Sequence, residues 1–136
     1  MGIALITGAS SGLGREYVRQ VGRDPHVQEI WAVARRAERL EELSSWTDCP
    51  VRPIPLDLAD PAGLDRLRDL LDQQKPKIRC LVCAAGFGRM GSIAALDPAE
   101  SLGMIDLNCR AVVAVTEMCL PYLHRGSRVV EFCSTA

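Results

Sequence analysis

Short runs of Val, Ile and Leu alternate along this chain with segments in which apolar residues recur every three or four positions. The runs predict strands and the periodic segments predict helices, in strict alternation. Each run is almost continuously apolar, as in parallel strands that helices cover on both faces. Because helical crossovers between parallel strands are right-handed, the pattern predicts a doubly wound parallel sheet of the α/β class, truncated after the fifth strand.

The predicted strands are Ile3 to Thr7, Glu29 to Ala34, Val51 to Leu56, Ile78 to Cys83 and Arg128 to Cys133. The predicted helices are Leu13 to Gly22, Ala37 to Ser45, Ala62 to Gln73, Ala99 to Leu107 and Arg110 to His124. In the third helix, Leu64, Leu67 and Leu71 form one apolar stripe, which is typical of a helix on a sheet. In a doubly wound sheet, ligands bind beyond the carboxyl ends of the strands, so we expect the functional site there.

Composition excludes several classes of function. The chain has 136 residues, of which 48% are hydrophobic, and this suits one domain with a substantial core. Its formal net charge of -1 gives no field that attracts nucleic acid or anionic lipid. No apolar run approaches the roughly 20 residues of a membrane helix, and the N-terminus lacks the basic start of a signal peptide. We therefore expect a cytoplasmic protein with no nucleic-acid or membrane partner.

Most of the six cysteines lie in apolar stretches, which favours buried free thiols. Cys80 and Cys83 have C-x-x-C spacing, but residues three apart on a strand point to opposite faces and cannot hold one metal ion. Only His26 and His124 are available as histidine ligands, and neither is near a cysteine pair. We therefore predict no metal site.

A glycine-rich turn, Thr7 to Gly14 (TGASSGLG), links the first predicted strand to the first helix. This placement predicts phosphate binding, because amides at a helix N-terminus attract anions. Glycine lets the chain leave the strand in a tight turn, lets backbone approach a pyrophosphate and lets the helix pack closely. The candidate cofactor-binding residues here are Gly8, Ser10, Ser11, Gly12, Leu13 and Gly14. A loop whose glycines serve turn geometry alone is the alternative.

The turn resembles the nucleotide-binding start of the short-chain dehydrogenase/reductase family, whose pattern is T-G-x-x-x-G-x-G. The whole chain is similar to the N-terminal half of a classical member. The resemblance implies that residues 1–136 form an NAD(P)-binding domain of the Rossmann type, the first part of a longer domain.

At the end of the second strand, Ala34-Arg35-Arg36 lacks the carboxylate that NAD-dependent family members place there. An acid would repel the 2′-phosphate of NADP, whereas a guanidinium offers a charged fork of donors. Arg35 is therefore the candidate for binding the 2′-phosphate, with Arg36 as the weaker candidate, and we expect NADP(H) rather than NAD(H). Two solvated arginines at a helix start are the alternative.

The segment after the third strand, Leu56 to Asp60, is similar to the family's D-V-x-D motif. The resemblance implies that Asp57 meets the adenine amino group and that Leu58 lines the ring. Asp60 has a plainer explanation, because an acid directly before Pro61 suits a helix N-terminus.

After the fourth strand, Cys83-Ala84-Ala85-Gly86 matches only the A-G half of the family's N-N-A-G motif. Ala85 and Gly86 still offer close backbone approach to a cofactor. The side-chain amides that tie this loop to its neighbours in the family are missing here.

Two catalytic residues are implied by the resemblance. Ile105 to Asn108 is similar to the family's helix join, in which Asn108 would bend the helix and hold a water of the proton relay. Val129 to Ala136 is similar to the strand that ends in S-S, in which Ser134 would polarise the substrate carbonyl. The family's Y-x-x-x-K pair has no counterpart, since the only lysines are Lys75 and Lys77.

The resemblance implies an NADP(H)-dependent oxidoreductase that transfers hydride between nicotinamide and a carbonyl or secondary alcohol substrate. The chain itself would be a fragment without the Tyr/Lys pair and inactive alone. The predicted helix Arg110 to His124 is apolar almost all round, and its family equivalent packs against a second copy, which implies a homodimer or tetramer. A non-catalytic NADP(H)-binding or regulatory module and a fragment unable to hold cofactor are the alternatives.

Overall fold

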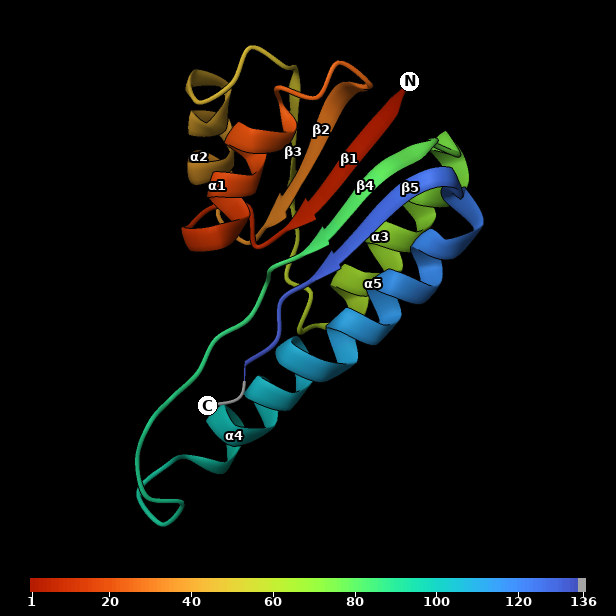
Figure 1. The fold of residues 1–136 in the computed structure, drawn as a ribbon. Helices are drawn as coiled ribbons and strands as arrows, with labels where there is room; N and C mark the ends of the chain where they lie inside the picture. The colour runs from red at the N-terminus through yellow and green to blue at the C-terminus, as the bar shows by residue number, and fades with distance from the viewer. Residues whose placement is uncertain (135–136) are drawn as a thin grey trace.

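A computed structural model describes residues 1–134 and contains one five-stranded parallel sheet in the order β3-β2-β1-β4-β5 (Figure 1). The strands are β1 (Gly2–Thr7), β2 (Val27–Ala34), β3 (Val51–Pro55), β4 (Ile78–Cys83) and β5 (Leu123–Glu131). The central strand β1 is buried at every position. The predicted parallel α/β sheet is confirmed.

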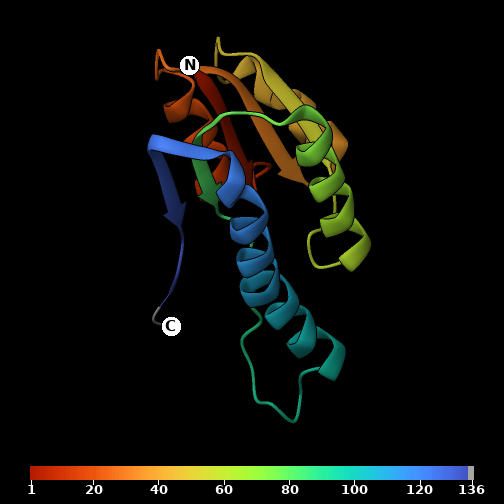
Figure 2. The same ribbon diagram turned by 90° about the vertical axis from the view of Figure 1, so that its right-hand side faces the viewer.

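Helices cover the two faces of the sheet in different ways (Figures 1 and 2). On one face lie α1 (Gly12–Val21) and α2 (Ala37–Glu41), which continues as a 3₁₀ turn over Glu42–Ser45. On the other face lie α3 (Pro61–Gln74) and α5 (Ala111–Cys119). The helix α4 (Pro98–Ile105) runs into α5 through a wider π-helical turn, Asp106–Arg110, and projects past the carboxyl ends of the strands.

Two apolar cores lie on the opposite faces of the sheet. Leu64, Leu67 and Leu71 of α3 are buried in one core, so the predicted apolar stripe is confirmed. Cys83 belongs to that core and Cys80 to the other. The two thiols of the C-x-x-C segment therefore point away from each other, as the strand period requires.

The start of α3 follows from two adjacent residues. A side-chain oxygen of Asp60 accepts a hydrogen bond from the backbone N–H of Ala62 at 2.9 Å, and Pro61 occupies the first turn. Proline fits there because its missing N–H would have no partner within the helix. The predicted capping role of Asp60 is confirmed.

The last predicted helix and strand have wrong boundaries. The helix predicted to reach His124 ends at Cys119, a 3₁₀ turn covers Leu120–Tyr122, and β5 begins at Leu123 instead of Arg128 and ends at Glu131. Pro121 has no N–H to donate, so the helix cannot continue past it. The helices predicted from Ala99 and Arg110 are, in contrast, one continuous helix.

The predicted continuous burial of all five strands is wrong for β3 and β5. Both strands pair with a single neighbour, and no residue of β5 is buried. In β3, Pro53 and Pro55 are exposed, which an edge strand tolerates because one of its sides needs no N–H donors. Cys109 and Cys133 are also exposed, so burial holds for only the other four thiols.

Candidate functional site

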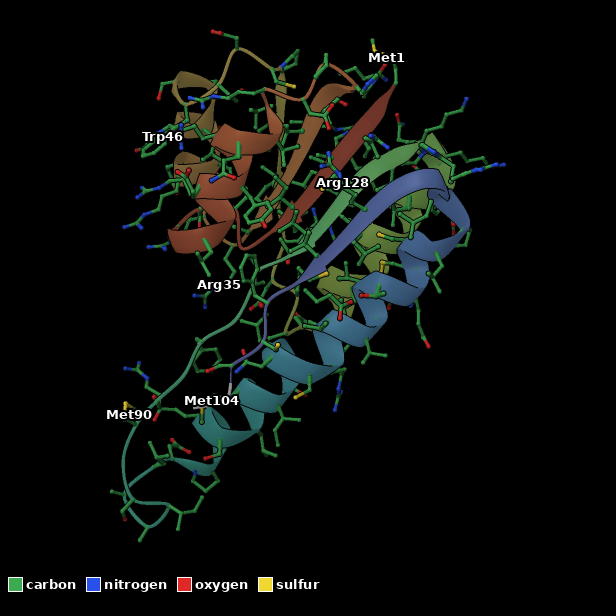
Figure 3. All side chains as sticks on the ribbon, in the orientation of Figure 1. Met1, Arg35, Trp46, Met90, Met104 and Arg128 are labelled. Carbon is green, nitrogen blue, oxygen red and sulfur yellow. The ribbon has the colours of Figure 1, made fainter. Side chains whose placement is uncertain are left out.

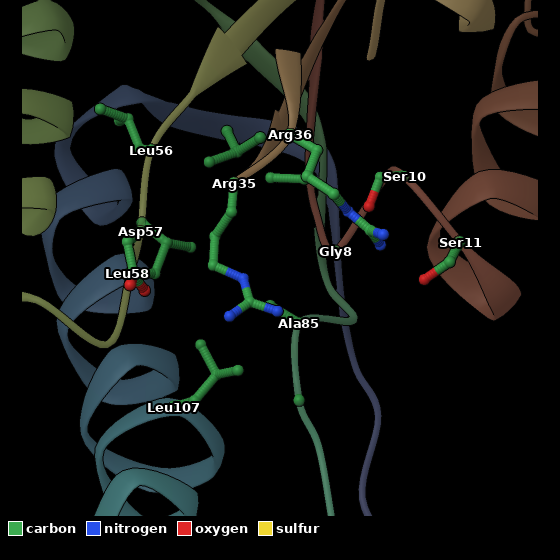
Figure 4. Close-up of a pocket in the computed structure, with 13 residues that line it drawn as sticks. Gly8, Ser10, Ser11, Arg35, Arg36, Leu56, Asp57, Leu58, Ala85 and Leu107 are labelled. Carbon is green, nitrogen blue, oxygen red and sulfur yellow. The ribbon is translucent and has the colours of Figure 1, made fainter. Parts of the chain in front are cut away.

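A pocket lies at the carboxyl ends of the strands and joins loops far apart in the sequence (Figure 4). Its walls come from the turn after β1 and from the segments that follow β2, β3 and β4. The lining residues are Gly8, Ser10, Ser11, Val33, Ala34, Arg35, Arg36, Leu56, Asp57, Leu58, Ala85, Gly86 and Leu107. Most of the candidate cofactor-binding residues are therefore brought into one pocket.

The glycine-rich turn is shaped by close backbone packing. A Cβ on Gly8 would lie 2.6 Å from the backbone nitrogen of Ala85, and a Cβ on Gly14 would lie 2.2 Å from the carbonyl oxygen of Gly8. Real Cβ atoms do not approach backbone so closely, so both positions require glycine. Gly12 shares a positive φ with Gly8, 52° against 66°, but apart from its chain neighbours and its own helix backbone no heavy atom of residues 1–134 lies within 4 Å of its Cβ position. The turn is therefore tightly packed at Gly8 and Gly14, whereas there is free space beside Gly12.

The N-terminus of α1 faces this opening with its amides available. Ser11 is the N-cap in an extended conformation and makes no capping hydrogen bond with its side chain, and the first turn carries no acidic residue. The first amides of a helix have no partner within it, and the helix dipole makes this end electropositive. The turn therefore offers free amides and positive potential, as an anion site requires, and its binding of a pyrophosphate stays a prediction.

Thr7 supports the loop after β4, a role that the sequence reasoning missed. Its side chain is only 2% exposed, and its hydroxyl oxygen accepts hydrogen bonds from the amides of Ala84 and Ala85, both at 3.2 Å. Cys83 and Ala84 have no side-chain amide that could tie this loop to the neighbouring strand. The Thr7 hydroxyl makes that connection instead. The available signal was a hydroxyl residue at the end of an otherwise apolar strand.

Two exposed guanidinium groups reach the pocket from the end of β2. Arg35 extends toward Ala85 and Leu107, whereas Arg36 extends toward Ser10 (Figure 4). Within residues 1–134, neither arginine forms an ion pair with a carboxylate. Their positive charge is therefore available to an anionic ligand.

The opposite wall of the pocket comes from the segment after β3. The Asp57 carboxylate accepts a hydrogen bond from the Ala59 amide at 3.0 Å, which fixes the turn. A Cβ on Gly63 would lie 1.9 Å from the Asp57 carbonyl oxygen, so α3 packs directly against this residue. Leu56 and Leu58 are both nearly buried. This wall is apolar with one carboxylate at its edge.

A second cleft adjoins the pocket and shares Ala85 and Gly86 with it. It is lined by Leu13, by residues 84–88, by Asn108 and Val112, and by residues 132–134. The two candidate catalytic residues, Asn108 and Ser134, therefore line the same cleft although 26 positions separate them in the sequence.

Asn108 lies in the π-helical turn and clamps the loop after β4. Its Oδ1 accepts a hydrogen bond from the Phe87 amide at 3.0 Å, and its Nδ2 donates to the Phe87 carbonyl at 2.7 Å. A Cβ on Gly86 would lie 2.9 Å from Oδ1, so glycine lets the amide approach. The side chain positions the loop, and its predicted place in a proton relay stays a prediction.

The end of β5, which leads to Ser134, is anchored from both faces of the sheet. The Thr116 hydroxyl donates to the Glu131 carboxylate at 2.7 Å on the α5 side. On the α1 side, the rings of Tyr17 and Phe132 meet edge to face with centroids 5.4 Å apart.

Burial raises the pKa of the neighbouring Cys83 thiol to about 11, so this thiol stays protonated near neutral pH.

Residues 1–134 contain neither a candidate metal centre nor a helix able to cross a membrane. Among residues 1–134, no group of three or more His, Cys, Asp or Glu side chains could hold a metal ion. No helix in this part of the chain has the length and apolar character needed to span a bilayer.

Comparisons with known proteins agree with this geometry. A family model described as short chain dehydrogenase matches residues 2–136. Sulfoacetaldehyde reductase 2 from Chromohalobacter salexigens is 33% identical over 143 residues, which cover 98% of this chain and 55% of the relative. The chain spans about half the length of the curated relatives it matches.

Two solved structures are similar at the level of both fold and sequence. The bulky-bulky ketone specific alcohol dehydrogenase from Comamonas testosteroni has a TM-score of 0.77 and 28% identity, covering 87% of this chain and 47% of its own. A short-chain dehydrogenase from Sphingobium yanoikuyae in complex with NADPH has a TM-score of 0.78 and 28% identity. The match covers 89% of this chain and 48% of that structure's chain.

Proposed function

Because the chain belongs to the short-chain dehydrogenase family, we propose that residues 1–136 form the nucleotide-binding half of an NADP(H)-dependent oxidoreductase. Its substrates are carbonyl compounds or secondary alcohols, and it works in the cytoplasm. The observation that carries the proposal is the single pocket shared by the glycine-rich turn, Arg35, Asp57 and the loop at Ala85. A solved relative in complex with NADPH supports the same cofactor.

The residues present fit NADP(H), which supplies or accepts the hydride when bound. The amides around Gly12 bind the pyrophosphate, while Arg35, with Arg36 beside it, binds the 2′-phosphate. Asp57 accepts a hydrogen bond from the adenine amino group, and Leu58 packs against the ring. Ala85 and Gly86 have little or no side chain, so their backbone can lie close to a ribose of the cofactor.

In the adjoining cleft, the Ser134 hydroxyl donates a hydrogen bond to the substrate carbonyl oxygen and stabilises its developing negative charge. Asn108 keeps the loop at Phe87 in place and so fixes the shape of the cleft. The proton for carbonyl reduction requires a tunable acid. Neither Tyr17 nor Tyr122 has a lysine four residues on.

We also propose a homodimer or tetramer that forms through the continuous helix of α4 and α5. Leu102 and Ile105 of α4 and Val113 of α5 are all more than half exposed. Such apolar exposure along one helix is typical of a surface that a partner covers. A second copy of the chain is the partner we propose.

A cofactor-binding module without turnover is the second candidate for residues 1–136, which contain no Y-x-x-x-K pair. The module is tested by mixing the 136-residue chain with NADPH and a panel of ketones and aldehydes while nicotinamide absorbance is followed. Oxidation of NADPH by this chain contradicts the module. Binding without oxidation agrees with both candidates, because the nucleotide-binding half is also expected to be inactive alone. A longer chain that carries a Y-x-x-x-K pair then separates them, since it oxidises NADPH only if the oxidoreductase proposal is correct.

Titration of the 136-residue chain with NADPH and NADH, followed by nicotinamide fluorescence, tests the cofactor site. NADPH is expected to bind at least about tenfold more tightly, because NADH lacks the phosphate that the guanidinium groups hold. Gly12→Asp should abolish binding by placing a carboxylate at the helix N-terminus. Gly12→Asn is the matched control, since it has nearly the same shape and meets the same backbone conformation, with a φ of 52°, but carries no charge. If neither NADPH nor NADH binds, the proposal fails.

A further inference from the structure

The end of the sheet at which the strands begin is a surface that the proposed function does not use. Met1 lies at this amino end, whereas Arg35 of the cofactor pocket lies at the opposite end (Figure 3). Both lysines of the chain, Lys75 and Lys77, lie in the turn that joins α3 to the start of β4. The amino end of the sheet therefore carries positive charge that is separate from the cofactor pocket.

A bulge in β5 adds a further cation beside this turn. Residues 124–127 of β5 lie opposite the single residue Arg79, between two regular pairs of β4 and β5. The extra residues leave the ladder, and Gly126 among them has a φ of 91°, which glycine adopts readily. Arg125 is exposed in the bulge.

Hydrogen bonds hold the bulge against the start of β4. The Ser127 hydroxyl donates to the Ile78 carbonyl oxygen at 2.6 Å, and the Arg79 guanidinium donates to the Gly126 carbonyl oxygen. Because Ile78 directly follows Lys77, these contacts fix the bulge next to the turn that carries the two lysines.

Three cations at this end have no carboxylate partner. Lys75, Lys77 and Arg125 are exposed, and none of them forms an ion pair within residues 1–134. Arg128 differs, because it pairs at 2.5 Å with Asp24, whose side chain is only 15% exposed. The charges of the first three residues are therefore available to a partner.

A second carboxylate near this end also has a partner of its own. Asp72, in the last turn of α3, accepts a hydrogen bond from the Tyr122 hydroxyl at 2.6 Å. This contact holds the carboxylate toward the segment between α5 and β5, so the amino end keeps an excess of positive charge.

Exposed apolar side chains accompany these cations. Leu120, at the start of the 3₁₀ turn before β5, is 56% exposed, and Met1 is 75% exposed. At a membrane surface, cations meet anionic headgroups while neighbouring apolar side chains enter the boundary of the acyl chains. The phosphate backbone of a nucleic acid would attract the cations but has no apolar layer for Leu120. The combination therefore favours lipid as the partner.

We propose that the amino end of the sheet binds reversibly to a membrane surface rich in anionic lipid, through Lys75, Lys77 and Arg125, with Leu120 entering the headgroup layer. The formal net charge of -1 predicts no membrane partner because it averages over the whole chain, whereas the fold gathers exposed cations at one end. Docking in this orientation leaves the cofactor pocket facing the solvent.

Sedimentation of the 136-residue chain with lipid vesicles tests the proposal. Vesicles of phosphatidylcholine with about 30% phosphatidylglycerol are expected to bind at least about tenfold more tightly than vesicles of phosphatidylcholine alone. Added salt should weaken this binding, because it screens the exposed charges. Equal binding to both kinds of vesicle, or binding to neither, would overturn the proposal.

Removing the two lysines tests whether this end is the binding surface. Lys75→Gln combined with Lys77→Gln should weaken binding to anionic vesicles roughly 20-fold, because each cation near the surface contributes about fivefold. Arg39→Gln combined with Arg66→Gln is the matched control, since it removes the same charge from exposed positions on α2 and α3. If both double variants lose binding equally, total charge rather than this surface decides, and the proposal fails.

NADPH titration of the same double variants keeps the result separate from the proposed function. Neither lysine lines the cofactor pocket, so the double lysine variant is expected to bind NADPH as the wild type does, which also shows that it folds. Loss of vesicle binding with intact NADPH binding supports the membrane proposal, and a wild type that binds vesicles but not NADPH contradicts only the oxidoreductase proposal.

Leu120→Ser separates lipid from nucleic acid. Binding to anionic vesicles should weaken at least about threefold, because less apolar surface enters the headgroup layer. Duplex DNA at the same phosphate concentration is expected not to displace the chain from the vesicles. If DNA displaces it, or if Leu120→Ser binds vesicles as well as the wild type, the surface recognises phosphate charge alone and the lipid proposal fails.

Discussion

At the residue scale, the site depends on buried contacts between the turn after β1 and the loop after β4. Thr7 holds two loop amides through one hydroxyl oxygen. The adjacent Gly8 lies so close to the same loop that a Cβ would meet the Ala85 nitrogen at 2.6 Å. A hydrogen-bonding hydroxyl at Thr7 and the absence of a side chain at Gly8 are therefore both needed where the end of β1 meets the loop after β4.

Replacing Thr7 with Val should lower the free energy of unfolding by about 2 kcal/mol, because two amides lose their acceptor. Thr7→Ser keeps the oxygen and is expected to cost less than half as much. Urea denaturation of both variants measures the difference. If valine and serine cost the same, the methyl group rather than the hydroxyl would be the stabilising part of Thr7.

Gly14→Ala should cost about 2 to 3 kcal/mol of stability, because its Cβ would lie 2.2 Å from the Gly8 carbonyl oxygen and backbone would have to move. Gly88→Ala is the control, since its Cβ position has open space and its cost should stay within about 0.5 kcal/mol. Thermal unfolding followed by circular dichroism compares them. A stable Gly14→Ala protein with intact NADPH binding would contradict this account of the turn.

Arg35→Asp should weaken NADPH binding by about 10- to 100-fold while changing NADH binding much less, since it replaces a phosphate-binding cation with an anion. Fluorescence titration with both cofactors gives the two ratios. Arg66→Asp on the exposed side of α3 makes the same charge change outside the pocket. Equal losses for NADPH and NADH would mean that the 2′-phosphate binds elsewhere.

At the scale of elements, β5 is the strand with the least burial and depends on polar anchors. Arg128 donates to the Asp24 carboxylate at 2.5 Å and so links β5 to the loop between α1 and β2. The hydrogen bond from the His26 amide lowers the pKa of Asp24 below its ordinary value of 3.8, and the charge of Arg128 lowers it further. The ionised carboxylate therefore stabilises the folded chain.

Because the pKa of Asp24 is lower in the folded chain than in the unfolded chain, its contribution is complete above pH 3.8 and is lost as the pH falls through the folded value. Asp24→Asn should therefore cost about 1 kcal/mol at pH 7, and the cost should shrink as the solution is acidified below pH 3.8. Urea denaturation across this pH range measures it, with Asp69→Asn on α3 as an exposed control. A cost independent of pH would exclude an ionic contribution.

At the scale of the whole molecule, the continuous helix through α4 and α5 extends past the body formed by the sheet (Figure 1). No residue of α4 is buried, although its sequence is largely apolar. A helix of this composition is stable when its apolar side chains are covered. The proposed contact between two copies would cover them.

Val113→Glu should weaken self-association at least about tenfold, because the carboxylate would enter an apolar interface without a partner. Val113→Leu preserves the apolar character and should leave association unchanged. Sedimentation velocity over a range of concentrations measures both variants. A wild-type chain that remains monomeric at all concentrations would remove the dimer proposal.

Predictions from sequence succeeded where local chemistry decides the structure. The period of apolar residues was sufficient for the parallel sheet, and Asp60 before Pro61 was sufficient for the start of α3. The boundary between α5 and β5 was missed because an apolar run carries no information on where helix gives way to strand. Pro121 was the one local signal, and the pairing of Leu123 with Ile78 extends the strand beyond the apolar run.

The sequence by itself determined the order of strands and helices, the tight glycine turn and the positive charges after β2, because each depends on neighbouring residues. Only the tertiary structure decided that Thr7 supports the loop at Ala84, that Asn108 binds Phe87, and that Ser134 shares a cleft with Asn108. These contacts join residues 21 to 77 positions apart. Packing of the sheet and helices sets such distances, and no local pattern in the chain encodes them.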